Sequence, residues 1–99
     1  MAAGHLVKTK LALSTSWSAV QTVPTGSAYL KIVLDDVTIA FDVQTSDNGD
    51  DPGASDPIES RPAGARFVDL YAGRMGGQDI RFRIRSASGT PNATVTTMG

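Results

Sequence analysis

The chain contains no cysteine, and this absence excludes several kinds of chemistry. None of its 99 residues can form a disulfide or offer a thiolate to a metal ion. Thiol redox chemistry and a cysteine-based zinc site are therefore excluded. Small secreted domains commonly depend on disulfides for stability, and this domain must be stabilised by other contacts.

Long apolar runs are also lacking. No stretch of the sequence is apolar for long enough to cross a membrane as a helix. The first 26 residues do not show the basic start and apolar stretch of a secretory signal. We therefore expect synthesis in a cytoplasm and no membrane association.

Large aliphatic and aromatic residues are scarce. Only 22 of the 99 residues are Val, Leu, Ile or Phe, close to the proportion of about one fifth below which chains tend to be disordered. The length suits one small domain spanning residues 1–99. Because a core of this size provides little net stabilisation, we expect the protein to associate as a homo-oligomer, with a trimer favoured.

The net charge is only −1, which argues against nucleic acid as the main partner. The charge is unevenly distributed along the chain, however. Residues 1–60 carry a net charge of −5, whereas residues 61–99 carry +4, with six arginines and no lysine. The two halves can pair within one chain or between copies, and both possibilities remain open at this point.

Alternation of apolar and polar residues predicts β-strands, and no window has helical spacing. We predict an all-β fold, a small antiparallel β-sandwich or flattened barrel of six to seven strands. The predicted strands lie at Leu6–Leu13, Ala19–Val23, Ala28–Leu34, Val37–Val43, Ala65–Tyr71, Asp79–Ser86 and Ala93–Met98. The last of these is rich in threonine, which suits a half-exposed edge strand.

The segment Ala28–Val43 consists of two alternating runs joined at Asp35-Asp36. Aspartate tolerates the positive φ that a two-residue hairpin turn requires. We therefore predict a tight hairpin in which Leu30 lies opposite Phe41.

The segment from about residue 44 to 65 is predicted to be a long acidic loop. It contains three prolines and seven acidic or amide residues. Its oxygen-bearing side chains could bind calcium, but Gly49 occupies a position where the twelve-residue calcium loop needs a ligand. The alternative is an acidic surface that contacts arginines of its own chain or of a neighbour.

Three arginines occupy every second position of the strand Asp79–Ser86, so they lie about 7 Å apart on one face. They could be a solvated strand face, a subunit contact or a polyanion-binding surface. Arginine suits fixed carboxylate partners because its guanidinium forms paired hydrogen bonds. The residues that we predict to form a protein interface are Arg81, Arg83, Arg85, Arg74, Asp50, Asp51 and Trp17.

No arrangement of residues predicts catalysis. His5 is the only histidine, and a serine nucleophile motif is missing. The glycines around Gly76 lack the lysine of a phosphate-binding loop. We predict that the protein is not an enzyme and has no cofactor or metal site.

Aromatic residues offer one further alternative. Trp17, Tyr29 and Tyr71 could form a platform on which a sugar stacks. Residues of this kind on separate segments more often anchor a core or an interface.

In the order of these features the chain resembles the small β-sandwich accessory proteins of tailed bacteriophages, among them head decoration or cement proteins. Four stretches carry the resemblance: TVPTGSAYLKIVL (22–34), VTIAFDVQTSDNGDDPGASDPIES (37–60), PAGARFVDLYAG (62–73) and IRFRIRSASGTPNATVTT (80–97). The resemblance implies a non-enzymatic virion protein on the capsid surface that binds major capsid subunits, commonly as a trimer. It supplies no site residues, because that group has no fixed functional positions. A tail, collar or fibre-base component is the alternative, and a carbohydrate-binding module is a further one.

Overall fold

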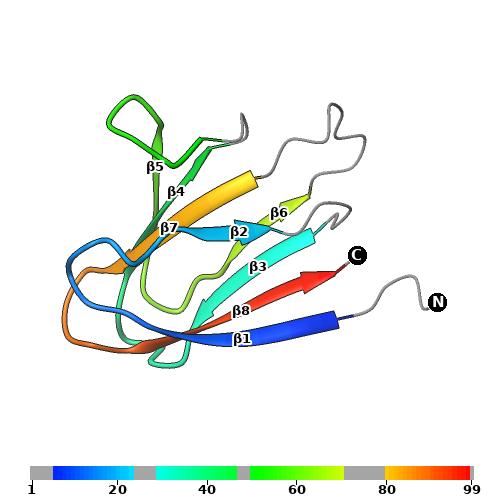
Figure 1. The fold of residues 1–99 in the computed structure, drawn as a ribbon. Helices are drawn as coiled ribbons and strands as arrows, with labels where there is room; N and C mark the ends of the chain where they lie inside the picture. The colour runs from blue at the N-terminus through cyan, green and yellow to red at the C-terminus, as the bar shows by residue number, and fades with distance from the viewer. Residues whose placement is uncertain (1–5, 24–28, 47–49, 71–79, 99) are drawn as a thin grey trace.

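The computed structural model describes residues 6–23, 29–46, 50–70 and 80–98, and these form eight β-strands (Figure 1). The strands are β1 (Leu6–Ala12), β2 (Gln21–Val23), β3 (Tyr29–Leu34), β4 (Phe41–Ser46), β5 (Ile58–Arg61), β6 (Phe67–Leu70), β7 (Ile80–Ser86) and β8 (Asn92–Met98). None of the described residues is helical, so no described helix is long and apolar enough to cross a membrane.

The strands form two sheets of four, with the orders β1-β8-β3-β6 and β2-β7-β4-β5. Every pair of neighbours is antiparallel. The predicted all-β antiparallel sandwich is therefore confirmed, although the described residues contain eight strands instead of six or seven. Figure 1 shows the two sheets as layers, with β1 and β2 along one side of the sandwich.

The order in which the chain visits the two sheets defines the topology. Consecutive strands lie in different sheets at every step except the step from β4 to β5. This double Greek-key order is that of the eight-stranded jelly roll.

The core lies between the sheets and follows the alternation of the sequence. On β7, Ile80, Phe82 and Ile84 are buried while the arginines between them point to the outer face. Burial removes these apolar side chains from water, which is the main stabilising term in folding. The same alternation buries Leu30, Ile32 and Leu34 on β3, and Phe41 and Val43 on β4.

The predicted hairpin between residues 28 and 43 is wrong. β3 pairs with β6 and β8, whereas β4 belongs to the other sheet. Asp35 and Asp36 have no positive φ, so the turn that a two-residue hairpin needs does not form. Instead the Asp36 carboxylate accepts hydrogen bonds from the N–H and hydroxyl of Thr38, at 3.0 and 2.6 Å. This Asx turn directs the chain across to the second sheet.

Two other predictions need correction. The segment predicted as a loop from 44 to 65 contains the end of β4 and the whole of β5, because Ile58–Arg61 pairs with Phe41–Gln44. The threonine-rich strand β8 is not an edge strand, since it lies between β1 and β3. Its Thr96 and Thr97 are buried by these neighbours.

Candidate protein interface on the arginine face

The arginine face is the outer surface of the sheet β2-β7-β4-β5, on which β7 presents Arg81, Arg83 and Arg85. The register of β7 with β4 places Asp42 opposite Arg85 and Gln44 opposite Arg83. Residues directly opposite each other in antiparallel strands share one face of the sheet. The pairing of β4 with β7 therefore brings polar partners to the arginines.

Two of the arginines form ion pairs within the chain. Arg85 Nε lies 2.8 Å from Asp42 Oδ2. Arg81 Nη1 lies 2.7 Å from Asp51 Oδ1, in the segment that precedes β5. The acidic segment thus meets arginines of its own chain, as one of the two alternatives from the sequence predicted.

Gln44 organises the centre of the face. Its side chain is only 2% exposed, and its Oε1 accepts a hydrogen bond of 2.7 Å from Arg83 Nε. Its Nε2 donates to the carbonyl oxygens of Gly53 and Asp56, at 2.9 and 2.8 Å. One amide therefore joins β7, β4 and the chain before β5, and all of its main hydrogen-bonding capacity is used.

The segment that Gln44 holds has its own turn. Asp56 N–H donates to the Gly53 carbonyl at 3.0 Å, and Gly53 N–H donates to the Asp56 carboxylate at 2.9 Å. Pro52, beside this turn, is buried. The turn is thereby fixed against the sheet, which places Asp51 next to Arg81.

Trp17 stacks on the two other arginines. The guanidinium carbons of Arg83 and Arg85 lie 4.7 and 4.3 Å from the centroid of its ring. A guanidinium over an indole face gains a cation–π attraction, which is strongest for tryptophan. The half-buried indole therefore holds both arginine side chains in fixed positions.

The chain before β2 positions Trp17 by pairing with β7. Ser86 N–H donates to the Ser14 carbonyl at 2.9 Å, and Ser18 N–H donates to the Ile84 carbonyl at 2.8 Å. Ile84 N–H in turn donates to the Ser18 hydroxyl at 3.0 Å. These bonds continue the pairing of β2 along β7 in irregular form, and the residues between Ser14 and Ser18 arch over the arginine face.

Asp42 is the acid at the centre of the network. Partial burial raises the pKa of its carboxyl, but hydrogen bonds from Ser60 and Arg85 and the charge of Arg85 outweigh burial and lower that pKa overall. The Ser60 hydroxyl donates to Asp42 Oδ1 at 2.7 Å. The carboxylate therefore stays ionised and paired under ordinary conditions.

The structure brings together most of the predicted interface residues. Arg81, Arg83, Arg85, Asp51 and Trp17 lie in one network, and the neighbouring Asp50 is exposed. Arg74 lies outside the described residues.

Sequence reasoning missed Asp42, Gln44 and Ser60, which are central to the network. Asp42 and Gln44 occupy alternate positions in a strand. That spacing was the signal that both side chains share the face opposite the core.

The other two sequence alternatives find these residues in different surroundings. Trp17 and Tyr29 do not form a common platform, because Tyr29 follows the outer parity of β3 in the other sheet, and Tyr71 lies outside the described residues. Among residues 6–23, 29–46, 50–70 and 80–98, no three His, Cys, Asp or Glu side chains are grouped as ligands for a metal ion. The calcium candidates Asp47 and Asn48 fall outside these ranges.

No protein-family model matches this chain, and neither a curated protein nor a solved structure is similar enough to match it.

Proposed function

We propose that this protein is a non-enzymatic structural component of a virion, a head decoration protein that binds major capsid subunits through its arginine face. The observation that carries the proposal is the stack of Trp17 with Arg83 and Arg85. Tryptophan and arginine are the residue types that most often dominate the energy of a protein interface.

The rigidity of this cluster favours binding. Hydrogen bonds from Arg83 to Gln44 and from Arg85 to Asp42 fix the guanidinium groups before any partner arrives. Immobilising a long side chain at an interface costs about 0.5–1.5 kcal/mol. Much of that cost is already met within the folded chain, which makes the arginine face a prepared contact surface.

The internal ion pairs change the kind of attraction that we propose. Arg81 and Arg85 are each paired with an aspartate of the same chain, so long-range attraction to an acidic partner is weakened. The stacked, planar groups then contribute chiefly through packing and through their remaining N–H donors. We therefore place Trp17 ahead of the arginine charges as the anchor of association.

The fold is compatible with this role without selecting it. Jelly rolls occur in viral capsid proteins, and also in lectins and cupins. Function follows from the site and not from the fold. The resemblance to phage accessory proteins and the prepared Trp–Arg surface together lead us to the virion role, with a trimer as the proposed oligomer.

The particle itself provides the first test. We expect particles that lack the protein to release their genome at a lower temperature or at low salt, and addition of the purified protein to restore stability. Unchanged particle stability would exclude a cement role. Copy number separates the alternative of a tail, collar or fibre-base component, because a head protein is present in hundreds of copies per particle and a tail protein in about a dozen or fewer.

Trp17 provides the second test, because it is the only tryptophan of the chain. Its fluorescence should shift when the protein binds particles, and Trp17→Ala should weaken binding by at least about tenfold if it is an interface anchor. Lys31→Ala is the matched control, since Lys31 lies on the outer face of the opposite sheet. Equal binding by both variants would assign association to another surface.

A further inference from the structure

The four edge strands of the sandwich differ in length. Three of them are short: β2 has three residues, and β5 and β6 have four each. Proline flanks β5 on both sides, at Pro57 and Pro62. β1 differs from them, with seven residues and no proline. Short strands and flanking prolines are common ways of preventing an edge from pairing with another chain, and β1 has neither.

The free edge of β1 is regular and accessible. β1 pairs residue by residue with β8 from Leu6 to Ala12, and no other described strand pairs with it. In an antiparallel edge strand, alternate N–H and C=O groups point away from the sheet and can accept a further strand. The residues from Val7 to Lys10 are all exposed, and β1 lies along the outer margin of its sheet (Figure 1).

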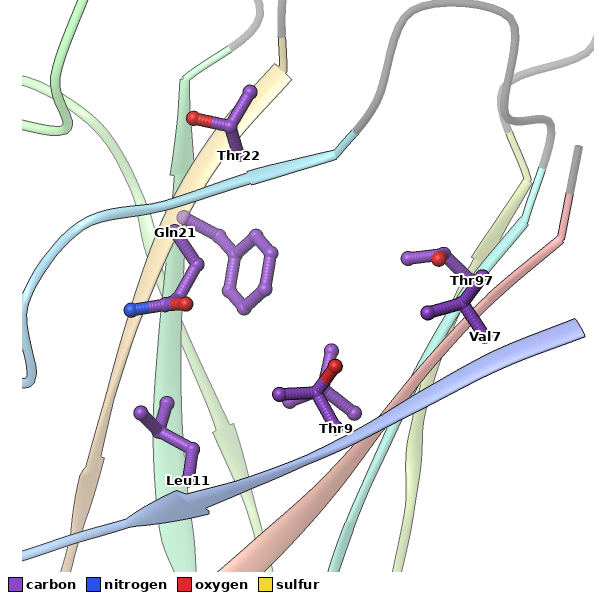
Figure 2. A pocket seen from close by; sticks show the side chains of 8 residues that line it. Val7, Thr9, Leu11, Gln21, Thr22 and Thr97 are labelled. Carbon is purple, nitrogen blue, oxygen red and sulfur yellow. The ribbon is translucent and has the colours of Figure 1, made fainter.

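A pocket of about 120 Å³ adjoins this edge, between the two sheets. We call it the edge pocket. Figure 2 shows Val7, Thr9, Leu11 and Gln21 pointing into the space between β1 and β2. The lining residues are mostly apolar or carry methyl groups: Val7, Thr9, Leu11, Gln21, Thr22, Phe82, Val95 and Thr97. Its volume suits one or two aliphatic side chains.

The opposite face of β1 is basic. Lys8 and Lys10 lie on the outer side of the sheet, opposite Thr96 and Thr94 of β8. Lys10 pairs with Asp35, whereas no ion pair is formed by Lys8 within the described residues. A strand added beside β1 would therefore meet lysine on one face and the edge pocket on the other.

We infer that the β1 edge binds an extended segment of another protein, in which acidic residues alternate with small aliphatic ones. Main-chain hydrogen bonds to β1 supply the attachment, the acidic residues face Lys8 and Lys10, and the aliphatic residues face the edge pocket. This site is separate from the arginine face and does not depend on the function proposed for it.

A second copy of this chain fits the edge less well. In a two-fold antiparallel pair of β1 strands centred on Thr9, Lys8 of each copy lies opposite Lys10 of the other. Like charges directly opposite each other destabilise a strand pair. The charge of the edge therefore selects an acidic strand over its own sequence.

The test uses the intact protein and the capped peptide Thr-Val-Glu-Val-Glu-Val-Thr. Placed with its central valine opposite Thr9, the peptide puts glutamate opposite Lys8 and Lys10 in either strand direction. We expect amide chemical shifts to change along β1, and hydrogen exchange to slow at alternate β1 amides. The peptide with lysine in place of glutamate is the control, and it should bind more weakly.

A charge reversal sharpens the test. Lys8→Glu is chosen because Lys8 is exposed and the Lys10–Asp35 pair is left intact. We expect about fivefold weaker binding of the glutamate peptide and tighter binding of the lysine peptide, as one reversed cross-strand pair predicts. Trp17→Ala should bind both peptides like the unmodified protein, which separates this site from the arginine face.

Three outcomes would overturn the inference. The first is no change at β1 amides at millimolar peptide. The second is binding that ignores both the peptide charge and Lys8→Glu. The third is a dimer of the free protein with protected β1 amides, because the edge would then belong to a second copy.

Discussion

The two outer faces of the sandwich use basic residues in opposite ways. The arginine face carries Arg81, Arg83 and Arg85 within a network of acids, an amide and an indole. The lysine face, defined as the outer surface of the sheet β1-β8-β3-β6, carries all three lysines of the chain. These are Lys8, Lys10 and Lys31, with threonines of β8 between them.

The ion pairs of the two faces show the difference. In the Lys10–Asp35 pair the side chains are 64% and 40% exposed, whereas in the Arg85–Asp42 pair they are 35% and 27% exposed. Exposed pairs contribute little to stability because water and salt screen them. The comparison teaches that the arginine face is part of the folded architecture, while the lysine face is a solvated surface. Four predictions test this contrast.

The largest effect should come from Gln44→Ala. This change removes three hydrogen bonds and leaves the Gly53 and Asp56 carbonyls and the Arg83 guanidinium without this partner. Because unsatisfied buried groups cost about 1–3 kcal/mol each in the unfavourable case, we expect a loss of about 2–4 kcal/mol. Urea denaturation measures it, and a loss below about 0.5 kcal/mol would show that water replaces the amide without cost.

Trp17→Ala should have the next largest effect. The variant loses both guanidinium contacts and the apolar area that the indole covers. We expect a loss of about 1–2 kcal/mol in the free energy of unfolding. Trp17→Phe should recover part of it, because phenylalanine keeps a ring but binds a cation less strongly than tryptophan. Identical stability of the two variants would mean that the ring makes no contribution.

Acid pH should distinguish the faces further. The folded-state pKa of Asp42 lies below the ordinary value of about 3.9. Its ionised form therefore stabilises the fold above that pH, and the contribution is lost as the pH falls through the lower folded-state value. We expect Asp42→Asn to lower stability at pH 7 and to flatten the decline below about pH 4, as measured by denaturation at several pH values.

Asp35 is the matched comparison for Asp42. Hydrogen bonds from Lys10 and Thr94 lower the pKa of its carboxyl in the same direction, but the group is exposed to solvent. We expect Asp35→Asn to change the acid limb less than Asp42→Asn does. The reverse order would contradict the contrast between the two faces.

The smallest effect should come from the lysine face. Lys31→Ala should change stability by less than about 0.5 kcal/mol, as is usual for a surface substitution away from a packed network. Adding salt should change the stability of this variant and of the unmodified protein equally. A loss above about 1 kcal/mol would show that Lys31 takes part in a structural contact.

The sequence predicted the strands better than their arrangement. The alternation at Ile80–Ser86 identified both the buried residues and the arginine row, because period two is a local property of a strand. The candidate site was predicted in part. Trp17 and the arginines were selected, but the buried Gln44 that joins them was not, since its role depends on Gly53 and Asp56 lying above it.

The hairpin error shows where local pattern ends. Leu30 and Phe41 are buried in either arrangement, whether their strands pair side by side or face each other across a core. Alternation records which face is apolar and not which strand lies next to it. The Asx turn at Asp36, rather than a positive φ, sent β4 into the other sheet.

The amino-acid sequence by itself therefore determined the all-β class and the polarity of each strand, because these follow from side-chain alternation and composition. Only the tertiary structure decided the strand order, the internal pairing of the arginines and the unpaired edge of β1. Each of these depends on contacts between residues far apart in the chain, and the free energy of such contacts is set by packing in three dimensions and not by neighbouring residues.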